Sequence, residues 1–344
     1  MGEVLGIGTT HFPPLLGETS TFSGLLKQAV LTSPLLPPEW KERDRWPKAM
    51  QTEWDNEAAA ARQHQEELIA GFRRTRKAID EFRPDAIILF GDDQYENFKE
   101  DCIPPFCVFM YDGMESRPFV GEVYGRNPWG EPADKVFVHR GHPALAKRLV
   151  TDLIERDRPV AYSYTNTPHF AQRFGPTMLS HAFLNTLVYL DWDRTGFDYP
   201  VIPIQVNCYG RNVISSLGGI GHLNPGARPA VGADDAAKTR INRPLIDWPA
   251  GEYGPPGPTP ASCFELGQHI RGILEELPGR YVVMGSSGWS HAFLCEKNYW
   301  LWPDLEFDRL HIDDLERGQQ RRWAQMTNAQ IDDAADQEFK NWIC

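Results

Sequence analysis

Three apolar stretches of this chain each run into a glycine and then into polar residues, and this repeated pattern constrains the fold most. They are VLGIGTTH (4–11), AIILFGDDQ (86–94) and YVVMGSSGWSH (281–291), and VIPIQVN (201–207) is a fourth strand candidate. Continuous apolar runs of this length, alternating with helical patterns, are typical of strands covered on both faces by helices. The sequence therefore predicts an α/β fold with a central, mostly parallel sheet and helices on both faces.

Helical patterns fill much of the chain between these strands. We expect helices at about residues 57–82, 142–156, 176–189, 263–277 and 319–343. Apolar residues recur at near-helical spacing in the first of them, and Pro143 suits the first turn of the second. Residues 208–262 are rich in glycine and proline, which predicts long ordered loops and not a second core.

Composition excludes several classes of partner. Lys and Arg number 35 against 47 Asp and Glu, so the net charge is −12, and no basic stripe is present. Nucleic acid and anionic membranes are therefore not expected as partners. No apolar run approaches the roughly 20 residues that span a bilayer, and the N-terminus has no signal-peptide pattern. The six cysteines are scattered without CxxC pairs, so we expect a cytoplasmic protein with free thiols.

The polar residues after the strands are the first candidates for chemistry. In open α/β sheets ligands bind outside the carboxyl ends of the strands, so His11, Gln94 and His291 should lie along one edge. His11 is either a hydrogen-bonded structural residue or a ligand. The small residues of GSSGWSH allow His291 to act as an acid or base, or they form only a turn. His181 lies in the apolar pattern LSHAF and is interpreted as a core residue.

Five segments of the chain, taken in order, resemble one enzyme family. They are GIGTTHFPPL, ILFGDDQYENFKEDCIPPF, GHPALAKRL, CFELGQHIRGILEELPGRYVVMGSSGWSH and DQEFKNWI. These segments, in this order, resemble the class III (LigB-type) extradiol ring-cleavage dioxygenases. Within that family they are most similar to the branch that contains the catalytic subunit of protocatechuate 4,5-dioxygenase and gallate dioxygenase. The resemblance implies one LigB-like domain over residues 1–344, with a helical insertion at about 30–82.

The resemblance also implies a non-haem metal centre, with Fe(II) as the expected ion and another divalent metal as the alternative. Enzymes of this family hold iron through two histidines and a glutamate, which leaves positions for substrate and O2. His11 matches the first histidine ligand and Glu338 the glutamate. His291 matches the acid–base histidine, and His169 a further active-site histidine. Substrate contacts are expected from Asp93, Tyr95 and Ser290.

Position 94 departs from the family pattern. Anchoring the comparison on IPPF (103–106) puts Gln94 where the family has its second histidine ligand. A glutamine oxygen can bind a hard cation, but it is neutral and a weaker donor to iron than imidazole. Metal affinity is therefore expected to fall. Asp92 or Asp93 is either a substitute anionic ligand or a cap of the turn.

The resemblance implies an oxidoreductase that opens the ring of a small catecholic, phenolic or related aromatic substrate with O2. The alternatives are a non-catalytic homologous subunit or binding protein of the same superfamily, and a diverged metal-dependent hydrolase that uses the same pocket. We expect the insertion at 30–82 to act as a built-in lid over the site. The protein is expected to form a homo-oligomer.

Overall fold

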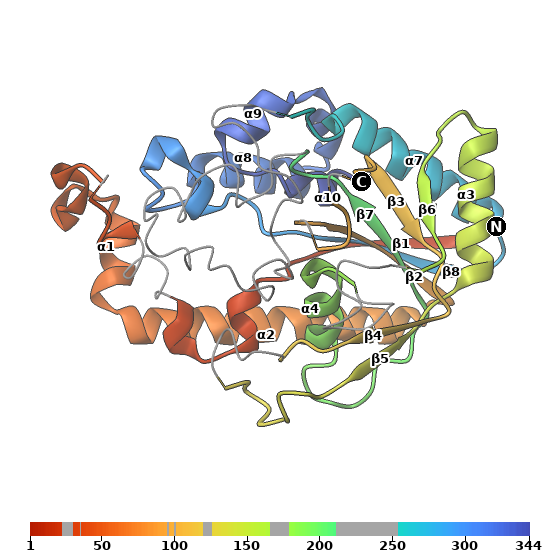
Figure 1. Ribbon diagram of the computed structural model, residues 1–344, viewed down its shortest axis with the longest axis horizontal. Helices are drawn as coiled ribbons and strands as arrows, with labels where there is room; N and C mark the ends of the chain where they lie inside the picture. Colours follow the sequence, from red (N-terminus) through yellow and green to blue (C-terminus); the bar gives the residue numbers. More distant parts are fainter. Residues whose placement is uncertain are drawn as a thin grey trace.

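A six-stranded sheet forms the centre of the computed structural model within its described residues (Figure 1). The described residues are 1–22, 30–34, 36–94, 96–99, 101–119, 126–165, 179–210 and 254–344. In spatial order the strands are β1 (Glu3–Thr9), β8 (Arg280–Ser286), β2 (Ala86–Asp92), β7 (Val201–Val206), β3 (Phe106–Phe109) and β6 (Ala161–Ser163). Neighbouring strands are parallel except β3 and β7, which are antiparallel. The predicted mostly parallel sheet is confirmed.

Helices cover both faces of this sheet, as predicted (Figure 1). The α-helices are α1 (Lys48–Asp55), α2 (Glu57–Phe82), α3 (Pro143–Glu155), α4 (His181–Leu190), α7 (Pro260–Glu276), α8 (Leu305–Glu316), α9 (Asn328–Asp333) and α10 (Phe339–Ile343). Short 3-10 helices are η1 (Pro13–Leu16), η2 (Thr19–Phe22), η4 (Pro38–Lys41), η5 (Arg43–Arg45), η6 (Ala292–Leu294), η7 (Glu296–Asn298) and η8 (Gln320–Gln325). A separate antiparallel pair is formed by β4 (Gly113–Ser116) and β5 (Phe137–Arg140).

Strand β2 shows why the sheet needs helices on both sides. Its seven residues are all buried, and successive side chains point to opposite faces. Ile88 and Phe90 belong to the core shared with α3 and α7, whereas Ile87 and Leu89 belong to the core shared with α2 and α4. An uninterrupted apolar run is the sequence that such a doubly covered strand requires.

Three of the predicted helices agree with the structure, whereas the one predicted at 176–189 corresponds to α4, which begins only at His181. The helix expected at 57–82 has the bounds of α2, and those expected at 142–156 and 263–277 are α3 and α7. The single helix predicted at 319–343 is wrong, because η8, α9 and α10 replace it. Thr327 starts α9 with a capping box, and Ala335, at φ 57°, turns the chain after it.

Some expectations fall on residues outside the described ranges. They include residues 176–178 of the helix predicted to start at 176, and residues 211–253 of the predicted loops. All six cysteines lie in described segments, where none forms a disulfide. No helix in the described part of the chain is both long enough and apolar enough to cross a bilayer.

Two glycines allow the C-terminal helix α10 to lie against the sheet. Gly8 of β1 and Gly285 of β8 are register partners. A Cβ atom on Gly8 would lie 2.2 Å from the Trp342 ring, and one on Gly285 would lie 2.6 Å from the main-chain oxygen of Asn341. Only a glycine pair leaves this space, and the close approach of α10 positions Glu338 near the carboxyl ends of the strands.

Gly285→Ala is expected to destabilise the protein by about 1–3 kcal/mol, because the new methyl group overlaps main-chain atoms that cannot rotate away. Gly6→Ala is the matched control, since nothing lies within 4 Å of the Cβ position at Gly6 in the neighbouring strand. Urea unfolding of both variants measures the difference. Equal stability of the two would show that the glycine pair does not hold α10.

Candidate metal centre

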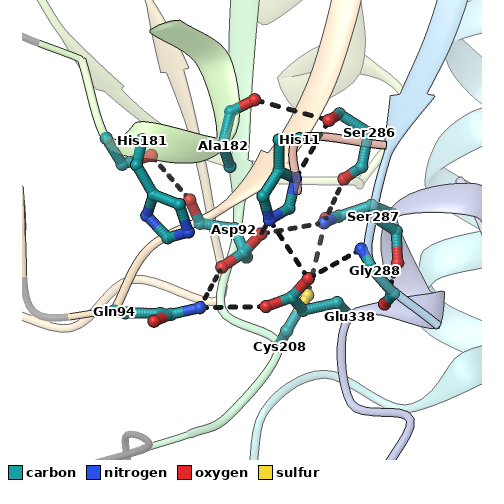
Figure 2. A network of polar contacts seen from close by, with 12 residues as sticks. His11, Asp92, Gln94, His181, Ala182, Cys208, Ser286, Ser287, Gly288 and Glu338 are labelled. Atoms are coloured by element: carbon teal, nitrogen blue, oxygen red, sulfur yellow. Dashed lines mark hydrogen bonds and ion pairs between the residues drawn. The ribbon is translucent and has the colours of Figure 1, made fainter. Parts of the chain in front are cut away.

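Side chains from both ends of the chain meet at the carboxyl ends of β1, β2 and β8 (Figure 2). His11 follows β1, Asp92 ends β2, and Glu338 directly precedes α10. The His11 Nε2 atom lies 3.2 Å from Oε2 of Glu338 and 3.7 Å from Oδ1 of Asp92. All three side chains are buried. The two residues predicted to be metal ligands, His11 and Glu338, therefore lie in contact.

The ring of His11 is oriented by a hydroxyl group. Its Nδ1 lies 3.0 Å from Oγ of Ser286, at the end of β8. That hydroxyl can donate to the carbonyl of Ala182, which is 3.4 Å away, and accept from His11 Nδ1–H. This tautomer leaves the lone pair of Nε2 facing the two carboxylates, which is the form of histidine that binds a metal.

Glu338 is enclosed by hydrogen-bond donors. Its Oε1 accepts from the Tyr209 hydroxyl at 2.6 Å and from the Gln94 amide at 2.9 Å, and its Oε2 accepts from the Gly288 main-chain N–H at 2.9 Å. Burial alone would raise the pKa of Glu338, but its interactions with His291 and His11 and its hydrogen bond from Tyr209 outweigh burial and hold that pKa well below its usual range. Glu338 is therefore an ionised carboxylate.

Gln94 presents its amide nitrogen, and not its oxygen, to the site. Nε2 of Gln94 donates to Glu338 and, at 3.3 Å, to Oδ2 of Asp92, so the amide bridges two buried carboxylates. Burial first, and the charge on Glu338 second, raise the pKa of Asp92 to about 7. In this orientation Gln94 is a hydrogen-bond donor that brings two acidic groups together.

His181 lies in the site, which corrects its interpretation as a core residue. It is the first residue of α4, and its Nδ1 lies 2.8 Å from Oε2 of Glu96. Burial lowers the pKa of His181, but Glu96, Asp92 and Glu338 outweigh this and raise it to about 10. His11, Asp92 and His181 each offer a ligand atom, all within 4.8 Å of one another, and could hold a metal ion.

His291 lies beside Glu338, with its Nε2 3.5 Å from Oε1. The loop after β8 places it there, and a Cβ on Gly288 would be 2.9 Å from its ring, so the glycine makes room. Its Nδ1 is buried without a hydrogen-bond partner in the described structure. Burial lowers the pKa of His291, which favours the neutral ring that a base requires.

The remaining predicted residues have other surroundings. Asp93 caps the turn, since its carboxylate accepts the N–H groups of Asn97 at 2.6 Å and Phe98 at 3.1 Å. The Ser290 hydroxyl donates a hydrogen bond to the carbonyl of Ala334 at 2.5 Å and accepts one from the N–H of Asp304 at 2.8 Å. The hydroxyl is therefore engaged both as a donor and as an acceptor by other main-chain groups of the protein. The expected positions Tyr95 and His169 lie outside the described residues.

Sequence reasoning missed Tyr209 and His181. Tyr209 follows the predicted strand VIPIQVN, and a tyrosine there carries no sign that its hydroxyl reaches residue 338. His181 was hidden by its apolar neighbours.

The fold and the site together define an α/β protein with a histidine–carboxylate centre at the carboxyl edge of a parallel sheet. Residues 253–344 match the family model described as the catalytic LigB subunit of aromatic ring-opening dioxygenase. That stretch contains both His291 and Glu338. The resemblance of the chain to the LigB-type superfamily is thereby confirmed.

Curated relatives support the same superfamily. A 2,3-dihydroxyphenylpropionate/2,3-dihydroxicinnamic acid 1,2-dioxygenase of Comamonas testosteroni is 25% identical over 216 residues, which is 63% of this chain and 46% of that protein. A second enzyme of this name, numbered 2, from Pseudomonas putida is 30% identical over 145 residues, or 42% and 37% of the two chains. The chain thus spans less than half the length of these relatives.

Tyr209→Phe is expected to reduce the free energy of unfolding by about 1.5–3 kcal/mol, because it removes a hydrogen bond to a buried, ionised carboxylate. Tyr199→Phe is the control, since its hydroxyl donates to Asp80 at 2.9 Å on the exposed surface and should contribute less than about 1 kcal/mol. Chemical denaturation of metal-free protein measures both. A larger loss for Tyr199→Phe would contradict this view of Glu338.

Proposed function

We propose that the protein is a metal-dependent extradiol dioxygenase that opens the ring of a small catecholic or related aromatic substrate with O2. The contact between His11 and Glu338 supports this most directly, because it brings an imidazole and a carboxylate from opposite ends of the chain to the ligand-binding edge of the sheet. The LigB match over residues 253–344 and the relatives, which are named as ring-cleaving dioxygenases, support the reaction class.

The donor atoms suit a first-row metal ion. Donors on one such ion, with bonds of roughly 2.1 Å, lie about 3 Å apart when adjacent and about 4 Å apart when opposite. The distances of 3.2 Å and 3.7 Å from His11 Nε2 to Glu338 and Asp92 fall in that range. A mixed set of imidazole and carboxylate suits non-haem Fe(II), which is the proposed metal. When bound, Fe(II) would lower the pKa of a catechol and let electron density pass from the catechol to O2.

His291 is proposed to move the substrate proton. Burial lowers its pKa, which favours the neutral ring, and its buried Nδ1 has no hydrogen-bond partner among the described residues. A neutral imidazole can accept a proton from a phenolic hydroxyl and return it to the product. Glu338 next to it stays anionic and so stabilises the imidazolium that forms.

The chain's own relatives suggest which substrates to test first. Their names specify catechols that carry an acidic side chain. A panel of 2,3-dihydroxyphenylpropionate, protocatechuate, gallate and catechol covers this class and the branch that the motifs resemble. A homo-oligomer remains a prediction.

Fe(II)-loaded protein is expected to consume O2 with at least one catechol of this panel, and His291→Ala is expected to lower kcat by about 10²–10⁴-fold at unchanged iron content, because the general base is removed. His269→Ala, on the outer side of α7 near Arg158, is the control. Oxygen-electrode assays and iron analysis measure both quantities. No uptake with any catechol would favour a non-catalytic homologue, and full activity of His291→Ala would remove the assigned base.

We further propose that the insertion at about 30–82 covers the site. Trp40 stacks with Tyr299 and Trp302 at centroid distances of 4.4 and 5.6 Å, in the segment that follows His291. His64 of α2 packs on Phe12, next to His11, at 5.4 Å. These contacts connect the insertion to both sides of the proposed site.

Trp40→Ala is expected to raise the KM for the catechol several-fold without changing metal content, because the cover would close less well. Trp54→Ala is a matched control in the same insertion, since the ring of Trp54 packs on the ring of Trp46 at 5.4 Å. Steady-state kinetics of the two variants distinguishes them. An unchanged KM for Trp40→Ala would argue against a lid.

A further inference from the structure

The chain lacks an imidazole at position 94, and a different histidine lies within reach of the same carboxylates. Gln94 offers only N–H groups to the site, donating to Glu338 and Asp92. His181 lies above Gln94 in the view of Figure 2, at the N-terminus of α4. Its ring lies 5.0 Å from the ring of His11 in an edge-on arrangement.

Glu96 fixes the orientation of His181. One carboxylate oxygen of Glu96 lies 2.8 Å from Nδ1 of His181, and the other accepts the His181 main-chain N–H at 3.0 Å. The Glu96 side chain is buried, so these two contacts with His181 are shielded from water. Since Nδ1 is engaged, Nε2 is the atom that His181 can offer as a ligand. A carboxylate that holds the far nitrogen of a histidine is the usual support of a metal-bound imidazole.

The position of His181 fits a metal ligand better than a residue that plays no part in the site. Its donor atom and those of His11 and Asp92 lie within 4.8 Å of one another, so a small shift brings all three onto one ion. Asp92 is fully buried at the end of β2, and Asn341 donates to its Oδ1 at 3.3 Å. Two buried carboxylates, Asp92 and Glu338, face this point and need a positive charge between them.

We infer that His181 supplies the imidazole that position 94 lacks, so that His11, His181, Asp92 and Glu338 together hold the metal. Gln94 is then a positioning residue that joins the two carboxylates, and Glu96 positions His181. The inference deepens the proposed function and rests on it for the presence of a metal. The second imidazole ligand then comes from the start of α4 and not from the loop after β2.

Anaerobic calorimetric titration of metal-free protein with Fe(II), and separately with Mn(II), tests this inference. His181→Ala is expected to weaken binding by roughly tenfold or more, the size of effect that metal-site residues have. Gln94→His in the His181→Ala background is expected to restore much of the affinity, because it returns an imidazole to the site. His269→Ala, on the outer side of α7 near Arg158, is the control and should bind like the parent protein.

Wild-type affinity in His181→Ala would overturn the inference, as would failure of Gln94→His to change the affinity of that variant.

A second measurement uses the wild-type protein alone and so does not require the variants to fold. Spin-echo modulation spectra of Cu(II)-loaded wild-type protein count coordinated imidazoles, and two are expected, whereas one would overturn the inference. Metal binding that depends on His181 without O2 uptake would support the inference and reject the dioxygenase proposal. Wild-type protein that binds no metal would reject both.

Discussion

The buried carboxylate of Glu338 is the group on which the arrangement of the site depends. An ionised carboxylate removed from water is costly unless polar groups replace its hydration. Here a tyrosine hydroxyl, a glutamine amide and a main-chain N–H do so, and they come from the ends of β7, β2 and β8. Glu338 therefore connects three strands of the sheet to the last helix of the chain. The glycine pair at positions 8 and 285 is needed because α10 must lie close enough for these contacts.

Much of the fold follows from sequence because its determinants are local. The uninterrupted apolar run in β2 predicts a strand buried on both faces, and the near-helical spacing in α2 predicts its bounds. The convergence of His11 and Glu338 could be expected only through the family resemblance, since nothing local links residues at opposite ends of a chain. The error at 319–343 arose because helical periodicity continues across Thr327 and Ala335, where a cap and a left-handed residue turn the backbone.

The candidate site was less predictable because its contacts join distant segments. His181 sits among apolar residues, and its partner Glu96 precedes it by 85 positions, so the pattern around it indicates a core residue. The orientation of Gln94 is likewise set by Asp92 and Glu338, whose mutual approach is a property of the folded chain. Polar residues at a strand end thus predict where a site lies, whereas the role of each depends on long-range packing.

The site combines two buried carboxylates with neighbouring imidazoles, and this set of donor groups suits a cation. Gln94 is neutral and can join Asp92 to Glu338 without cancelling their charge. A divalent ion would place positive charge between the two carboxylates and would also stabilise the folded protein, because it binds only the assembled site. Folding and metal binding are therefore expected to be linked.

Anomalous diffraction from crystals grown with Fe(II) in the absence of oxygen tests whether His11 and Glu338 hold the metal. Data collected on either side of the iron absorption edge locate the ion without assumptions about its ligands. One strong peak is expected within about 2.3 Å of both His11 Nε2 and a carboxylate oxygen of Glu338. A peak elsewhere, or none in crystals shown to contain iron-saturated protein, would contradict it.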